Sequence, residues 1–152
     1  MVPWWRVAVF AAFALPITAF DLREMRIPDE LSLGGAAVAA ALAVLSPGSS
    51  LLDLALEALV GFGVFWVISV ATGGKLGLGD AKYSVLIALS LGMYAWLTTV
   101  AVASVTALAV ALAVVLRHRA PRDERLPFAP FLTLGAAVSV ALQRLLPGGL
   151  PA

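Results

Sequence analysis

"YSVLIALSLGMYAWLTTVAVASVTALAVALAVV", residues 83–115, decides the fold, because it runs for more than 30 residues without a charged side chain. One helix of this length would be about 50 Å long. The hydrocarbon core of a bilayer is only about 30 Å thick, and about 20 apolar residues cross it. We therefore expect two membrane-spanning helices here, separated near residues 89–96, where Gly92, Tyr94 and Trp96 suit a turn at the membrane interface.

The rest of the chain has the same membrane character. Of its 152 residues, 62% are hydrophobic and 12% are charged, whereas soluble domains are roughly 45–50% apolar and 25% charged. Four further apolar segments are candidate spans: residues 3–20, 31–47, about 54–72 and about 127–146. The sequence thus predicts an all-α polytopic membrane helix bundle with about six transmembrane helices. We expect a single domain over residues 1–152, with the first span retained rather than cleaved as a signal peptide.

The basic residues predict the orientation of this bundle. Eight of the ten fall in the first, third and fifth loops: Arg23, Arg26, Lys75, Lys82, Arg117, Arg119, Arg122 and Arg125. Cytoplasmic loops carry the excess of lysine and arginine, so both termini should face outward. We expect a multi-pass protein of the inner (plasma) membrane. The net charge of +1 and the lack of a long basic run give no indication of nucleic-acid binding.

Two aspartates stand at the cytoplasmic ends of predicted spans. Asp21 follows the first apolar segment directly, in "FDLREMRIPDE" (20–30), and Asp80 opens the fourth span, in "GGKLGLGDAKY" (73–83). Ionisable groups at a membrane boundary are costly and usually face a bundle interior or a wet cavity. Position alone leaves two alternatives. The pair is either reactive, or it consists of interfacial charges, with Asp21 paired to Arg23 and Asp80 at a helix start.

Composition excludes several other catalytic chemistries. The chain has no cysteine, which rules out disulfides, thiolate zinc sites and a cysteine nucleophile. An H-E-x-x-H zinc site needs two histidines and is absent, because the chain has only one, His118. This histidine is expected to be a solvated loop residue. The serine-hydrolase motif G-x-S-x-G is also absent. Paired carboxylates remain, since two neighbouring aspartates can share a proton, one acting as base on water and the other as acid.

Gly77 and Gly79 precede Asp80. Glycine permits unusual backbone angles and close approach of another chain. A peptide bond inside a helix is protected from attack, so a membrane protease must bind its substrate locally extended, and a glycine-rich segment is able to pair with such a strand. The alternative is a simple turn before a helix.

Three motifs resemble those of type IV prepilin peptidases. "DLREMRIPDELSL" (21–33) is similar to the family's D-x-R-x-x-x-I-P-[ND]-x-L-[ST]-L segment. "GLGDAK" (77–82) resembles its G-x-G-D-x-K motif, whose G-x-G-D core is shared with presenilin-type intramembrane aspartyl proteases. "RLPFAPFLTLGA" (125–136) looks like the start of the family's last span. The motifs appear in family order, and the resemblance covers essentially the whole chain.

The resemblance implies that Asp21 and Asp80 are the catalytic pair of an aspartic endopeptidase. Its substrates would be prepilin-like precursors with a short basic leader and a hydrophobic helix, cut at the cytoplasmic membrane face. It places Gly77, Gly79 and Lys82 in the active-site loop and gives Asp29 a role in organising the first loop. No metal or organic cofactor is implied, since water is the nucleophile.

Larger bacterial members of this family carry a four-cysteine zinc insert and methylate the new amino terminus. This cysteine-free chain resembles the compact, peptidase-only form, so methyl transfer is not expected. The proline-rich residues 127–131 either place backbone near the active site or only open a helix.

Two other functions compete with this interpretation. A small proton-coupled transporter or relay bundle would use the same carboxylates. However, both lie at one interface, and no charge lies between Tyr83 and Leu116 to continue a pathway. An inactive scaffold subunit would have no reason to keep both aspartates.

Overall fold

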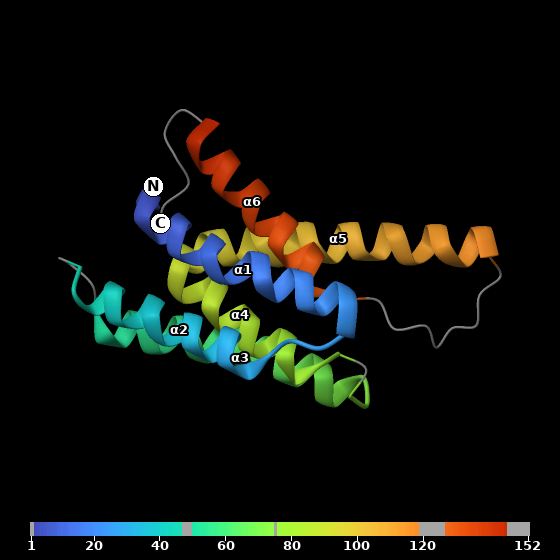
Figure 1. The fold of residues 1–152 in the computed structure, drawn as a ribbon, viewed down its shortest axis with the longest axis horizontal. Coiled ribbons are helices and arrows are strands. Elements are labelled where there is room, and N and C mark those ends of the chain that lie inside the picture. The colour runs from blue at the N-terminus through green and yellow to red at the C-terminus, as the bar shows by residue number, and fades with distance from the viewer. Residues whose placement is uncertain (1, 47–49, 75, 119–126, 146–152) are drawn as a thin grey trace.

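The computed structural model describes residues 2–46, 50–74, 76–118 and 127–145 (Figure 1). These ranges contain helices and connecting loops but no strand. The helices are α1 (Trp4–Glu24), α2 (Asp29–Val44), α3 (Leu51–Ala71), α4 (Leu78–Leu91), α5 (Met93–His118) and α6 (Ala129–Leu145). The prediction of an all-α polytopic bundle is confirmed.

The helices differ in length more than the sequence suggested. Three are long and apolar enough to cross a membrane, namely α1, α3 and α5, and α6 is a shorter apolar helix. These features make the chain a membrane protein. Helix α4 has only 14 residues, so it is about 21 Å long and shorter than a hydrocarbon core of about 30 Å.

The predicted division of the long uncharged stretch is confirmed. Helix α4 ends at Leu91, α5 begins at Met93, and Gly92 between them has a φ of 84°. Side chains disfavour this conformation, which glycine adopts readily.

Two helices extend further than expected. Helix α1 continues through Asp21 to Glu24, and α5 continues to His118, because charged residues prolong a helix as readily as apolar ones once its hydrogen bonds are formed. Arg23, Arg117 and His118 therefore belong to terminal helical turns rather than to loops. Lys82, expected in the third loop, lies within α4. Lys75, Arg119, Arg122 and Arg125 lie outside the described residues.

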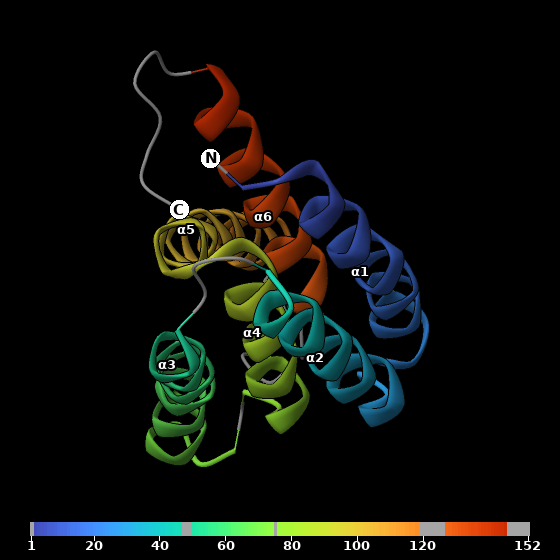
Figure 2. The same cartoon turned by 90° about the vertical axis from the view of Figure 1, so that its left-hand side faces the viewer.

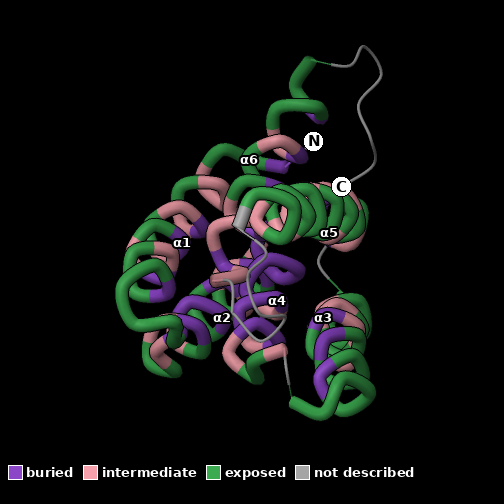
Figure 3. The backbone as a smooth tube through the Cα atoms, turned by 90° about the vertical axis from the view of Figure 1, so that its right-hand side faces the viewer, coloured by how far each residue is buried: buried purple, intermediate pink, exposed green. Residues whose placement is uncertain are grey.

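Helix α4 occupies the centre of the bundle (Figure 2). It contacts each of the other five helices, and most of its residues are buried (Figure 3). The surrounding helices have exposed apolar side chains, among them Leu59 and Val67 of α3 and Leu108 and Leu116 of α5. A large apolar exterior of this kind is typical of a surface in contact with lipid.

Glycines allow the helices to approach one another closely. A Cβ added at Gly61 of α3 would lie 3.2 Å from the Ala88 Cβ of α4. At Gly135 of α6 it would collide with the carbonyl oxygen of Thr99 in α5. Small residues at helix crossings are the usual way in which membrane helices come close enough to pack.

The order of the helices brings four helix ends together. The C-terminal ends of α1 and α3 and the N-terminal ends of α4 and α6 lie at one end of the bundle (Figure 1). The beginning of α1 and the ends of α2 and α4 lie at the other. Asp21, in the last turns of α1, and Asp80, in the first turn of α4, therefore share the same end.

Candidate active site

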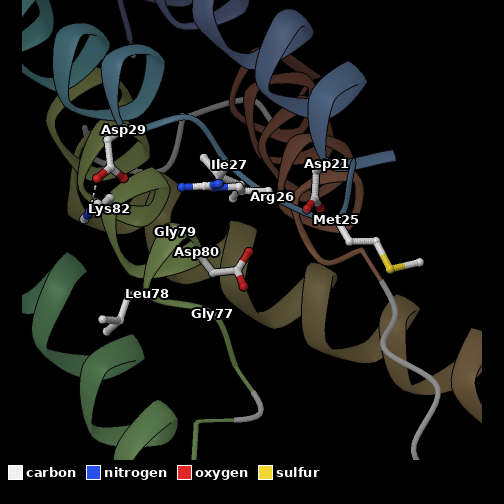
Figure 4. Close-up of a pocket in the computed structure, with 10 residues that line it drawn as sticks. All are labelled: Asp21, Met25, Arg26, Ile27, Asp29, Gly77, Leu78, Gly79, Asp80 and Lys82. Atoms are coloured by element: carbon white, nitrogen blue, oxygen red, sulfur yellow. Dashed lines mark hydrogen bonds and ion pairs between the residues drawn. The ribbon is translucent and has the colours of Figure 1, made fainter. Parts of the chain in front are cut away.

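Asp21 and Asp80 line one pocket with a volume of about 240 Å³ (Figure 4). Both side chains are nearly buried, with 5% and 8% exposure respectively. The other lining residues are Met25, Arg26, Ile27, Asp29, Gly77, Leu78, Gly79 and Lys82. The structure thus brings together all five residues that the sequence singled out for the site.

The Asp21 carboxylate lies at the N-terminus of α6. Its Oδ2 accepts a hydrogen bond of 2.9 Å from the backbone N–H of Ala129, the first residue of that helix. The first N–H groups of a helix have no partner within it and favour a negative charge beside them. The sequence left open whether residues 127–131 place backbone near the site or only open a helix. The structure shows that this segment places backbone against Asp21.

Asp80 lies on α4 beside the extended residue Gly77. Its backbone N–H donates a 3.1 Å hydrogen bond to the Gly77 carbonyl oxygen, and its carboxylate extends from α4 into the space that Asp21 also faces (Figure 4). Two buried carboxylates in one pocket repel each other when both are ionised, so they are expected to hold one proton between them. A carboxylate pair that shares a proton is able to activate a water molecule, with one member as base and the other as acid.

The two glycines of the predicted active-site loop differ in their surroundings. A Cβ at Gly79 would lie only 2.9 Å from the Ile27 Cβ, whereas one at Gly77 would make an ordinary 3.4 Å contact with the Asp80 Oδ2. Neither glycine has a positive φ, so the unusual backbone angles considered for them are not seen. Gly79 instead allows the loop after α1 to pack directly on α4.

Lys82 joins α4 to the start of α2. Its Nζ lies 2.6 Å from the Asp29 Oδ2, at the start of α2, in a solvent-accessible ion pair. Such a pair contributes only about 0–1 kcal/mol to stability. The ion pair therefore serves mainly to hold the end of the first loop against α4. This agrees with the role in organising the first loop that was expected for Asp29.

Met25 is a site residue that the sequence did not indicate. It ends α1 in the left-handed region, with a φ of 50°, and its N–H donates to the Asp21 carbonyl oxygen at 2.9 Å. Helices usually end this way at glycine or asparagine, so no composition signal marked this turn. Ile27 was marked only as part of the I-P motif and not as the partner of Gly79.

Within the described ranges, no group of three or more histidine, cysteine or acidic side chains is placed to hold a metal ion. The residues of the pocket are those of a carboxylate pair with its supporting loop.

Residues 8–112 match the model of the type IV leader peptidase family. The chain belongs to this family. A prepilin leader peptidase/N-methyltransferase of Pectobacterium carotovorum subsp. carotovorum is 27% identical over 143 residues, which cover 91% of this chain and 51% of the relative. One of Burkholderia pseudomallei (strain 1026b) is 29% identical, over 88% of this chain and 46% of the relative.

The chain therefore spans about half the length of these leader peptidase relatives. No solved structure matches it. The family expected from the three motifs is confirmed, and it is a family of peptidases. The structure adds that both aspartates lie in one pocket, which the family match by itself does not show.

Proposed function

We propose that this chain is a membrane aspartic endopeptidase that removes the leader peptide from prepilin-like precursors at the cytoplasmic membrane face. The observation that carries the proposal is the pair of nearly buried aspartates, Asp21 and Asp80, in one pocket at one end of the bundle. Membership of the type IV leader peptidase family supports it. The proposal covers the peptidase activity alone.

The two carboxyl groups would have different roles. A hydrogen bond from a backbone N–H favours an ionised carboxylate, and Asp21 receives one from Ala129. We therefore assign the base to Asp21 and the acid to the protonated Asp80. Asp21 would take a proton from water as the water oxygen attacks the scissile carbonyl, while Asp80 would give its proton to the carbonyl oxygen. Collapse of the tetrahedral intermediate then breaks the C–N bond. The leaving amine takes the proton from Asp21, and one hydroxyl of the intermediate returns its proton to Asp80 as the carbonyl group re-forms.

The place of the pocket suits a precursor with a basic leader and a hydrophobic helix. The pocket opens at the end of the bundle, between α1, the first loop and α4. A substrate helix embedded in the bilayer would present the residues before its first turn at this level. The bond to be cut would then lie at the membrane boundary, which explains why Asp21 follows an apolar segment directly.

The first prediction tests this function by co-expressing the protein with a prepilin-like precursor and following the size of the precursor on a gel. Asp21→Asn and Asp80→Asn should each abolish leader removal, because asparagine keeps the size of the side chain but cannot take up or release the proton. The double variant should be no worse than either single one, as for residues that act as a unit.

The matched control is Asp53→Asn, which makes the same change in the first turn of α3, at the opposite end of the bundle. It should process the precursor normally, with all variants present in the membrane at equal amounts by immunoblot. Normal processing by either Asp21→Asn or Asp80→Asn would overturn the assignment.

A further inference from the structure

Three hydroxyl groups from three helices meet one turn away from the aspartates. The Oγ1 atoms of Thr18 in α1 and Thr133 in α6 are 2.6 Å apart. The Tyr83 hydroxyl of α4 lies 2.7 Å from the same Thr133 oxygen. Thr133 also donates to the carbonyl oxygen of Ala129 at 3.0 Å. Tyr83 is fully buried, and none of the three hydroxyl residues lines the pocket.

The chemistry of the hydroxyl group fixes the direction of these hydrogen bonds. A threonine hydroxyl has one proton to donate and two lone pairs to accept with. A carbonyl oxygen can only accept, so the Thr133 proton goes to Ala129. Thr18 and Tyr83 must then each donate to Thr133. Thr133 uses its full capacity and is the common acceptor that connects α1 and α4.

Each member of this network is one helical turn from a group of the site. Thr18 precedes Asp21 by three residues, and Tyr83 follows Asp80 by three. Residues three or four apart lie on the same face of a helix. Thr133 bonds to Ala129, whose own N–H holds the Asp21 carboxylate. The network therefore ties together the three backbone segments that carry the two aspartates and the donor to Asp21.

We propose that Thr133 is a positioning residue that sets the relative placement of Asp21 and Asp80 through its bonds to Thr18 and Tyr83. The inference rests on the proposed peptidase function and names residues that support the same site without touching substrate. Loss of the Thr133 hydroxyl would leave two donors without a partner in a region where lipid offers none. The helices would shift to satisfy them, and the aspartates would shift with the helices.

The test compares Thr133→Val with Thr133→Ser in the purified full chain, using a prepilin-like precursor as substrate. Valine keeps the shape of threonine without the hydroxyl, and serine keeps the hydroxyl without the methyl group. A small displacement of catalytic groups costs up to roughly a hundredfold in rate. We expect kcat to fall roughly tenfold to a hundredfold in Thr133→Val with KM nearly unchanged, since Thr133 is outside the pocket, and Thr133→Ser to restore kcat.

The matched control is Thr106→Val. Thr106 is also partly buried, but among the described residues its hydroxyl bonds only to carbonyl groups of its own helix, Val102 and Ala103. It should keep the kcat of the unmodified protein. A Thr133→Val variant with full kcat, or a loss of kcat that Thr133→Ser fails to restore, would overturn the positioning role.

A second measurement does not depend on activity. Spin labels on cysteines at Leu22 and Leu78 should report a changed or broadened separation in Thr133→Val. Both residues are exposed and lie in the turns that carry Asp21 and Asp80, and Leu78 also lines the pocket, which this measurement tolerates because it does not use cleavage. Thr133→Ser and Thr106→Val should give the unmodified separation. Absence of cleavage by the unmodified protein would refute the proposed function. Even then, an unchanged separation in Thr133→Val would refute the positioning role independently.

Discussion

At the scale of single residues, the site depends on contacts between positions that are far apart in the chain. Asp21 and Ala129 are 108 residues apart, and Thr18 and Thr133 are 115 apart. The sequence predicted that Asp21 and Asp80 share one end of the bundle, because helices that cross alternately return to the same side. It did not indicate the hydroxyl network, because threonine and tyrosine are ordinary residues of membrane helices and no local pattern pairs them.

The contact between Gly79 and Ile27 gives the second prediction. Gly79→Ala should lower the stability of the protein by about 1–3 kcal/mol, since the added methyl group overpacks a tight contact with backbone-proximal atoms of Ile27. Thermal unfolding in detergent measures the effect. Gly77→Ala is the control, because its methyl group meets only an ordinary contact. Equal stability of the two variants would show that the loop after α1 does not pack on Gly79.

At the scale of the helices, the sequence predicted the existence and order of the elements better than their ends. The break at Gly92 was predictable from the length of the uncharged stretch. The extension of α1 beyond Asp21 was not, since the charged residues Arg23 and Glu24 marked a loop by composition although they continue the helix. The close helix crossings were not predictable either, because the sequence does not show which glycines face a neighbouring helix.

The third prediction separates glycines at a crossing from glycines on a free helix face. Gly135→Ala should lower the free energy of unfolding by about 1–3 kcal/mol, because the new methyl group would collide with the Thr99 carbonyl oxygen and separate α5 from α6. In Gly63→Ala, in α3, the new Cβ would meet no described atom within 4 Å other than those of its chain neighbours and of its own helix backbone. It should be neutral or stabilising by up to about 1 kcal/mol, since alanine favours helix more than glycine does.

Denaturant unfolding of the two glycine variants, in the same detergent, makes the comparison direct. A Gly135→Ala variant as stable as Gly63→Ala would contradict the close approach of α5 and α6 at this point.

At the scale of the whole molecule, the proposed orientation places the pocket on the cytoplasmic side. Leu45 directly follows α2, and Tyr94 lies in the first turn of α5, at one end of the bundle. Thr72 directly follows α3, at the end that carries the aspartates, and all three residues are exposed. The absence of cysteine from the sequence allows single cysteines to be placed at the exposed positions without background.

The fourth prediction follows from this orientation. Cysteines at Leu45 and Tyr94 should react with a membrane-impermeant thiol reagent in intact cells, and one at Thr72 should react only after permeabilisation. Labelling is read by a mass shift of the protein. Reaction of the Thr72 cysteine from outside would show that the protein has the opposite orientation, with the aspartates on the side away from the cytoplasm.

The central position of α4 has a consequence for biogenesis. A segment of 14 residues that contains Asp80 and Lys82 is too short and too polar to partition into a bilayer by itself, where about 20 apolar residues are needed. Its neighbours in the chain, α3 and α5, are both long enough to cross. Residues 78–91 fused alone between reporter domains should therefore fail to insert, whereas residues 51–118 should insert. The translocation machinery would have to release this helix into protein rather than into lipid. On this view the side of the pocket that carries Asp80 forms only after the flanking helices have entered the membrane.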